Sequence, residues 1–235
     1  MSPPAKSKSV VIVFTRAVER KCLGMGAAND AVALAASLRV TLEAVRAGCG
    51  DARIAVVSDR PLAVDSDHQL SQRGDSFEER LLAACDDVSA LGYERLVVVG
   101  SDTPELSVKD VATALAGHDV VVGPAVDGGV YLFSVAADRR ALLAGLPWCT
   151  PALLRALCTR AGEASLRVVK LALRRDLDNA ADARALSTLL EKLCRHRLGE
   201  PVLAVRGTDE EEDGRVISFI APTSSLATAS VGPPR

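Results

Sequence analysis

The chain of 235 residues is poor in aromatic side chains, which make up 3% of it. Aromatic side chains are the platforms on which nucleic-acid bases stack, and the formal net charge of −2 supplies no basic field for a phosphate backbone. No apolar run approaches the roughly 20 residues that a membrane-spanning helix requires. We therefore expect neither nucleic acid as a partner nor a membrane span.

Cysteine is present, but not in the patterns that bind zinc or build a disulfide framework. The six cysteines include no Cys-x-x-Cys pair, and the polar start MSPPAKSKS lacks the apolar segment of a secretory signal. We therefore expect reduced thiols in a cytoplasmic protein. The chain also lacks the P-loop pattern and the glycine fingerprint of dinucleotide-binding folds.

What the chain does contain is a repeated alternation of apolar, strand-like runs with helix-like segments. Strands are predicted at residues 9–14, 53–58, 96–100, 119–122, 130–135 and 166–171. Helices are predicted at residues 31–47, 76–91, 108–116, 151–161 and 181–194. Nearly continuous apolar strands are typical of a sheet buried on both faces, so we predict an α/β fold with a mostly parallel central sheet between two layers of helices.

Helix starts and chain ends complete this outline. Asn29 or Asp30 is expected to cap the first helix and Ser76 the second, and Pro151 to occupy the first position of the fourth. One domain is expected over residues 9–198, after a disordered start at residues 1–8. The acidic block GTDEEEDG predicts the tip of a β-hairpin over residues 199–220, with a frayed extension as the alternative, and residues 221–235 are expected to be a disordered tail.

Two acidic residues follow predicted strands, where open α/β sheets place ligand chemistry. Asp102 comes after the strand at 96–100 and directly before Thr103-Pro104, and Asp178 lies in the segment RRDLDN after the strand at 166–171. Because such loops gather at one rim of the sheet, Asp102 and Asp178 are candidate ligands of a shared Mg²⁺ or Mn²⁺ ion. Helix capping is the alternative explanation for either residue.

Three further features are candidates for ligand contact. Asp127 precedes Gly128-Gly129, where the backbone is able to approach a ligand closely, although a plain turn explains the same letters. The loop at residues 15–26 holds basic residues before two glycines and suits a diphosphate, with a solvated surface loop as the alternative. Trp148 is expected in the core or in the wall of a cleft.

Taken in order, these motifs resemble a known family. Gln72, Gly74, Asp75, Arg80 and Leu81 are followed by GSDTP, GPAVDGG, a lone Trp before a helix, and DLDN. This order is similar to that of the bacterial "transferase 1" family, which is associated with radical-SAM and selenium-related gene clusters and includes proteins described as arsenosugar-pathway glycosyltransferases. The resemblance spans about residues 10–193. It implies the Rossmann-like GT-A fold of nucleotide-diphospho-sugar transferases.

The resemblance also implies an activity, transfer from a nucleotide-diphospho-sugar donor to a small-molecule acceptor with Mg²⁺ or Mn²⁺. It implies that Asp102 and Asp127 are catalytic and that Asp102 and Asp178 are the metal ligands. It assigns the acceptor side to Gly128, Gly129 and Trp148. The residues that it assigns to the nucleotide are Thr15, Arg16, Gln72, Gly74, Arg80 and Ser101.

Two departures from the family pattern bear on this activity. The family's loop K-x-P-x-x-G-x-x-K-T-R-L, which contacts the donor phosphates, is replaced here by residues 15–26, which keep Arg16 in the first Lys position and lack the Pro-Gly pair. Val130 stands where the pattern usually has an aromatic residue. The alternatives are therefore a nucleotidyltransferase that acts on a phosphorylated small molecule, and a degenerate GT-A domain that binds without catalysis.

Overall fold

The structure, a computed structural model, describes residues 8–16 and 23–198. The chain divides into two units, Met1–Leu203 and Ala204–Arg235, and every described residue belongs to the first. The sequence predictions for residues 1–7, for the hairpin over 199–220 and for the tail over 221–235 lie outside the described residues.

Seven strands of the described residues form one sheet in the order β3-β2-β1-β4-β6-β5-β7. These strands are β1 (Ser9–Phe14), β2 (Arg53–Ser58), β3 (His68–Ser71), β4 (Arg95–Gly100), β5 (Val120–Pro124), β6 (Val130–Ala136) and β7 (Val168–Lys170). In this part of the chain only β6 runs against its neighbours, pairing antiparallel with both β4 and β5. The predicted mostly parallel sheet is confirmed.

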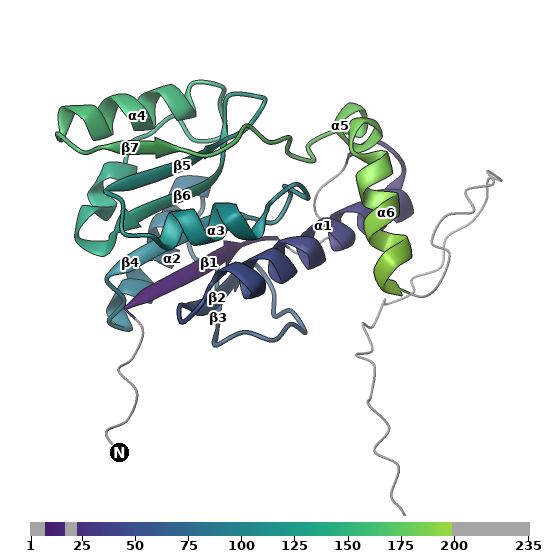
Figure 1. Cartoon of the computed structure of the whole chain (residues 1–235), viewed down its shortest axis with the longest axis horizontal. Coiled ribbons are helices and arrows are strands. Elements are labelled where there is room, and N and C mark those ends of the chain that lie inside the picture. The colour runs from purple at the N-terminus through teal and green to yellow at the C-terminus, as the bar shows by residue number, and fades with distance from the viewer. Residues whose placement is uncertain (1–7, 17–22, 199–235) are drawn as a thin grey trace, which may run out of the picture. The chain divides into compact units, whose positions relative to one another are not determined.

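Helices cover both faces of this sheet (Figure 1). One face packs against α2 (Phe77–Ala90), the 3₁₀ helix η2 (Ala137–Leu143) and α4 (Leu153–Glu163). The other packs against α1 (Ala27–Gly48) and α3 (Val108–Leu115), which lie side by side in Figure 1. Alternate residues of each strand enter the two apolar layers, as Val11 and Ile12 of β1 do. The three-layer α/β/α architecture is therefore confirmed.

A smaller third apolar cluster joins the last helices to α1. Leu186 and Leu190 pack with Leu34 of α1 and with the fully buried Leu177. Here the single helix predicted over 181–194 is wrong, because the structure has α5 (Ala180–Ala185) and α6 (Ser187–Leu198), with Leu186 as the C-cap of α5. Figure 1 shows both helices beside the end of α1 at which that helix begins.

The topology creates a crevice between β1 and β4. These strands are parallel neighbours, and the helices that follow β1 and precede β4, α1 and α2, lie on opposite faces of the sheet. Open α/β sheets bind ligands at such a switch point, outside the carboxyl ends of the strands. The fold therefore places a candidate site after Phe14 and after Gly100.

Several helix starts differ from the sequence predictions. Helix α1 begins at Ala27 with Gly26 as its N-cap, so the caps predicted at Asn29 or Asp30 are wrong. Asp30 instead accepts hydrogen bonds from three backbone N–H groups of the preceding loop, those of Leu23, Gly24 and Met25.

The starts of the later helices and the strand lengths agree only in part with the predictions. Helix α4 begins at Leu153 with Ala152 as its N-cap, so Pro151 lies outside the helix. Strand β7 is shorter than predicted, and strand β3 was not predicted. Ser76 does cap α2, in a capping box with Glu79.

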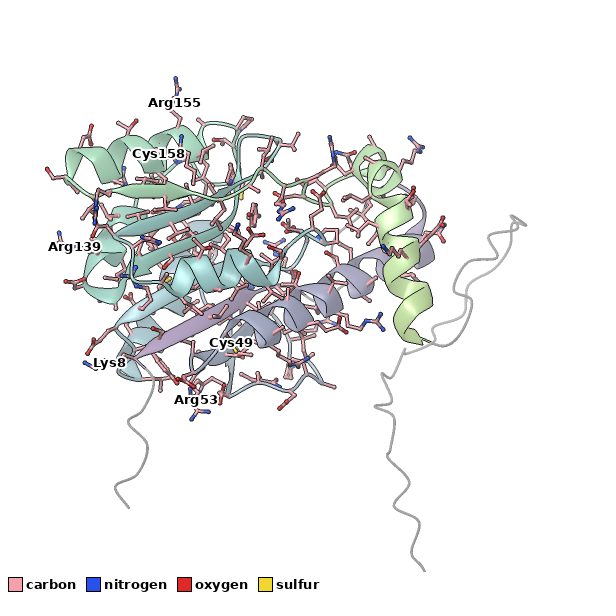
Figure 2. All side chains as sticks on the ribbon, viewed as in Figure 1. Lys8, Cys49, Arg53, Arg139, Arg155 and Cys158 are labelled. Carbon is pink, nitrogen blue, oxygen red and sulfur yellow. The ribbon has the colours of Figure 1, made fainter. Side chains whose placement is uncertain are left out.

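The side chains of Cys49, Cys85, Cys149 and Cys158 are all free thiols. Figure 2 shows Cys49 at the end of α1 and Cys158 on α4, well apart from each other. Within the described residues, no helix combines the length and the apolarity that crossing a membrane requires.

Candidate active site

A cavity of about 440 Å³ opens at the switch point between β1 and β4. Its size lies within the range typical of small-molecule sites. The ends of β1 and β4, the start of β6 and the segment after β7 all contribute lining residues. Of the residues assigned to metal, nucleotide, acceptor or catalysis from the sequence, those that line the cavity are Thr15, Arg16, Ser101, Asp102, Asp127, Gly129 and Trp148.

Hydroxyl groups hold the two strand ends together at this cavity. Thr15 Oγ1 and Ser101 Oγ are 2.7 Å apart, and Ser37 Oγ of α1 donates to the carbonyl oxygen of Ser101 at 2.9 Å. Gln72, which follows β3, donates through Nε2 to the carbonyl oxygen of Thr15 at 2.6 Å. Gln72 therefore fixes the residue before Arg16 without lining the cavity itself.

Asp176, like Asp102, is a carboxylate of the cavity wall. Thr103 Oγ1 donates to Asp176 Oδ1 at 2.5 Å, and the backbone N–H of Leu177 donates to the carbonyl oxygen of Asp102 at 2.8 Å. These two bonds join the segment after β7 to the end of β4. The motif RRDLDN predicts Asp178 as the candidate of this segment, whereas the residue of the motif that lines the cavity is Asp176.

Electrostatics set Asp176 apart from an ordinary surface carboxylate. Burial, followed by the charge of Asp102, raises the pKa of Asp176 to about 7, and the charges of Asp178 and Asp127 act in the same direction. The hydrogen bond from Thr103 opposes this shift. A carboxyl group with such a pKa is able to exchange a proton near neutral pH.

Asp178 is near this group but is not part of the cavity lining. Its backbone N–H faces Asp182 Oδ2 at 3.4 Å. Its neighbour Asn179 caps α5 by accepting hydrogen bonds from the backbone N–H groups of Ala181 and Asp182. The residue of this segment that caps a helix is therefore Asn179 and not Asp178.

The Asp127-Gly128-Gly129 sequence forms a tight turn into β6. Asp127 Oδ1 accepts the backbone N–H of Gly129 at 2.8 Å. Gly128 has φ +89°, and a Cβ there would lie 2.4 Å from the carbonyl oxygen of Pro151. The turn thus requires glycine at 128 for its backbone, while Asp127 and Gly129 face the cavity.

Gly74 and Arg80 shape the first turn of α2 and do not line the cavity. Gly74 has φ +123°, and a Cβ there would meet Glu79 Cβ at 2.5 Å. Arg80 Nη1 donates to the carbonyl oxygen of Asp75 at 2.9 Å. The charge of Arg80 does reach the cavity edge, because Arg16 and Arg80 lower the pKa of the Cys149 thiol, which burial raises overall.

The donor set suits a divalent cation that a substrate helps to bind. No three His, Cys, Asp or Glu side chains in residues 8–16 and 23–198 are grouped so as to hold a metal by themselves. Mg²⁺ commonly takes one or two carboxylates and fills its other positions with substrate phosphates and water. Asp102 and Asp176, two carboxylates of the cavity lining, provide that kind of oxygen ligand.

The fold is shared with transferases of known structure. A protein of Desulfovibrio desulfuricans G20 assigned to the nucleotide-diphospho-sugar transferases matches with a TM-score of 0.64 and 22% identity, over 80% of this chain and 98% of that one. A nucleotidyl transferase from Methanothermobacter matches with a TM-score of 0.53 and 15% identity, over 78% and 98%.

A CMP:2-keto-3-deoxy-manno-octonic acid synthetase, solved with CTP, matches with a TM-score of 0.51 and 13% identity, over 80% and 99%. At these identities the likeness concerns the fold alone, and it defines the class as Rossmann-like, with nucleotidyl and sugar transferases as its structural neighbours. A search of the curated proteins finds no match. The family model described as "Uncharacterized protein conserved in bacteria (DUF2064)" matches residues 31–150, just over half of the chain, and the protein belongs to this family.

Proposed function

We propose that the protein is a metal-dependent transferase that moves a sugar from a nucleotide-diphospho-sugar to a small-molecule acceptor. The observation that carries the proposal is the juxtaposition of Asp102, Asp127 and Asp176 with Arg16 in one cavity at the strand switch point. Carboxylates for a cation and a guanidinium for phosphate are the groups that a nucleoside diphosphate needs. The motif order that resembles the radical-SAM-associated "transferase 1" family supports the same activity.

Each residue of the rim has a role in this proposal. Asp102 and Asp176 hold Mg²⁺ or Mn²⁺, and Asp178, whose charge reaches Asp176, is the alternative second ligand. When bound, the ion supplies positive charge that stabilises the diphosphate leaving group. Arg16 contacts a phosphate oxygen, and the fixed Thr15–Ser101 pair orients the strand end from which Arg16 projects.

The other side of the cavity takes the acceptor. Asp127 is held in place by the N–H of Gly129 and is the base to which an acceptor hydroxyl passes its proton. The proton leaves the hydroxyl oxygen as that oxygen bonds to the sugar carbon and the nucleoside diphosphate departs. We also propose that the protein is cytoplasmic, which the free thiols of Cys49, Cys85, Cys149 and Cys158 support.

Calorimetric titration tests the site. UDP-, GDP- and CDP-sugars are titrated with Mn²⁺ into the wild type, Asp102→Ala, Asp176→Asn and Asp178→Asn. We expect one donor to bind, and Asp102→Ala and Asp176→Asn to weaken it by tenfold or more, about 1.4 kcal/mol. Asp138→Asn, which removes an exposed carboxylate of η2, is the matched control. If no donor binds, or if both cavity variants bind as the wild type does, the site assignment is wrong.

Product analysis separates the two alternatives. A nucleotidyltransferase releases pyrophosphate from a labelled nucleoside triphosphate and a phosphorylated small molecule, whereas a sugar transferase releases a nucleoside diphosphate. A domain that only binds gives neither product, although its nucleotide affinity still depends on Asp102. Metal-dependent release of nucleoside diphosphate that Asp127→Asn abolishes is the result expected from the proposal.

A further inference from the structure

Aromatic side chains gather at the cavity to a degree that the composition does not lead one to expect. The whole chain has one Trp, two Tyr and four Phe. Five of these seven residues line this one cavity: Phe14, Phe77, Tyr131, Phe133 and Trp148. The cavity therefore has an aromatic part in addition to its acidic rim.

Four of the rings form a continuous surface, which we call the aromatic wall: Phe14, Phe77, Trp148 and Phe133. Ring centroids are 5.6 Å apart for Phe14 and Phe77, 5.7 Å for Phe77 and Trp148, and 5.9 Å for Phe133 and Trp148. Phe14, Phe77 and Trp148 are only partly buried although they pack on the core. Because they also line the cavity, part of their ring surface faces it.

The aromatic wall offers no hydrogen bonds to a ligand. Trp148 Nε1 is the only polar side-chain atom of the four rings, and it donates to the carbonyl oxygen of Leu143 at 3.1 Å. The neighbouring cavity residues Leu81, Val98 and Val130 are aliphatic. A sugar or the edge of a nucleobase placed here would lose hydrogen bonds to water without replacement, at about 1–3 kcal/mol for each group. An apolar ring has no such loss and gains from burial.

The aromatic wall adjoins the acceptor side of the rim. Val130 directly follows Asp127-Gly128-Gly129 and enters β6, the strand that also carries Phe133. A molecule that lies against the aromatic wall is thus close to the carboxylate proposed as the base. From these contacts we infer that the cavity binds an acceptor with an uncharged aryl or saturated carbocyclic ring, which rests on the aromatic wall while its hydroxyl group reaches Asp127.

That the bound ring compound is an acceptor rests on the proposed function, but its binding to the aromatic wall is tested without nucleotide or metal. Trp148 is the only tryptophan, so its fluorescence reports directly on the aromatic wall. Benzyl alcohol, cyclohexylmethanol and, for comparison, methyl glucoside are each titrated into the protein. We expect both ring alcohols to change the Trp148 emission in a saturable way and methyl glucoside to leave it unchanged. A response to methyl glucoside alone, or to none of the three, overturns the inference.

Two variants test the location. Val130→Tyr adds a ring within the cavity and fills the space, and Phe77→Leu removes one ring while keeping an apolar side chain. We expect each to weaken benzyl alcohol binding roughly tenfold. Tyr93→Leu is the matched control, because Tyr93 pairs with His68 and does not line the cavity. Thermal unfolding of Val130→Tyr, which deletes no core atoms, verifies the fold, and unchanged affinity in this folded variant contradicts the inference.

Competition with a nucleotide separates this inference from the proposed function. UDP, GDP and CDP are each added with Mn²⁺ to the protein that holds benzyl alcohol. Binding of a nucleotide beside the alcohol supports the inference. Displacement of the alcohol would show that the nucleobase occupies the aromatic wall, and it would overturn the inference. If the alcohol binds and no nucleotide does, the proposed transferase is wrong while the ring-binding subsite stands.

Discussion

Among single residues of the cavity, Asp176 has the most strongly altered acidity. Burial and then the charge of Asp102 raise its pKa from 3.8 to about 7. The unfolded chain has a carboxyl pKa near 3.9, so between about pH 4 and pH 7 the folded protein holds a proton that the unfolded chain has lost. The contribution of this group to stability is therefore complete below about pH 4 and is lost as the pH rises through about 7.

Asp176→Asn tests this pH dependence because asparagine keeps an oxygen for Thr103 and cannot ionise. We expect the variant to be more stable than the wild type at pH 8, by at most about 4 kcal/mol, with the difference shrinking towards pH 4. Urea unfolding at several pH values measures it. Asp138→Asn provides the baseline for an exposed carboxylate. Parallel stability curves for wild type and Asp176→Asn would show that the carboxyl is not perturbed.

The choice between Asp176 and Asp178 shows where prediction from the sequence ends. Both acids were visible in RRDLDN, and in an extended segment residues two apart point to the same side. What distinguishes them is the bond from Thr103 to Asp176 and the bond from Leu177 to Asp102. Both bonds cross more than 70 residues of chain, so no local pattern encodes them.

Gly128 is a residue whose role in the turn can be separated from a role in binding. Alanine at this position must adopt φ +89° and place its Cβ 2.4 Å from the carbonyl oxygen of Pro151. We expect Gly128→Ala to lower the free energy of unfolding by about 1–3 kcal/mol. Chemical denaturation measures the change, and Gly162→Ala, which has open space around its Cβ and lies in α4, is the control. A change no larger in Gly128→Ala than in the control would contradict the geometry.

At the scale of elements, the apolar runs predicted six of the seven strands of the described residues, and the capping signal of Ser76 predicted the start of α2. Strand β3 is not predicted from the sequence, because its four residues, HQLS, alternate between partly buried and exposed positions and contain little apolar character. The antiparallel direction of β6 is not predicted from the sequence either. A buried strand looks equally apolar in either direction, and only the turn at Asp127-Gly128-Gly129 sends this one back between β4 and β5.

The segment between β7 and α5 is held against α3 by a largely buried ion pair. Arg174 Nη2 donates to Asp110 Oδ2 at 3.0 Å, with side-chain exposures of 24% and 7%. We expect Arg174→Met to lower the free energy of unfolding by about 3 kcal/mol, because the buried side chain of Asp110 loses its ion-pair partner. Since Arg174 precedes Asp176 by two residues, donor binding should weaken as well.

The matched control for this element is Arg167→Met. Its side chain is 92% exposed and pairs with Asp119, so we expect a change below about 1 kcal/mol. Denaturant unfolding and calorimetry with the donor compare the two variants. If Arg174→Met keeps wild-type stability, the ion pair does not hold the segment in place.

At the scale of the whole molecule, the cavity depends on the complete sheet. It combines the end of β1, the end of β4, the start of β6 and the segment after β7, which meet only when the strand order reverses between β1 and β4. The sequence predicted the three layers because they follow from short-range patterns, and it predicted Asp102 and Asp127 as candidates because each follows an apolar run. The aromatic wall could not be predicted in this way, since its rings come from four separate parts of the chain.

A ligand that needs this assembled rim binds only the folded protein and therefore raises its stability. We expect Mn²⁺ at one hundred times its dissociation constant to raise the free energy of unfolding by about 2.7 kcal/mol. Because protonated Asp176 is not a ligand, the gain should increase as the pH rises through about 7. Unfolding followed through Trp148 measures it, with Asp138→Asn expected to behave as the wild type and Asp176→Asn to lose most of the gain. An equal gain in Asp176→Asn would show that Asp176 is not a ligand of the ion.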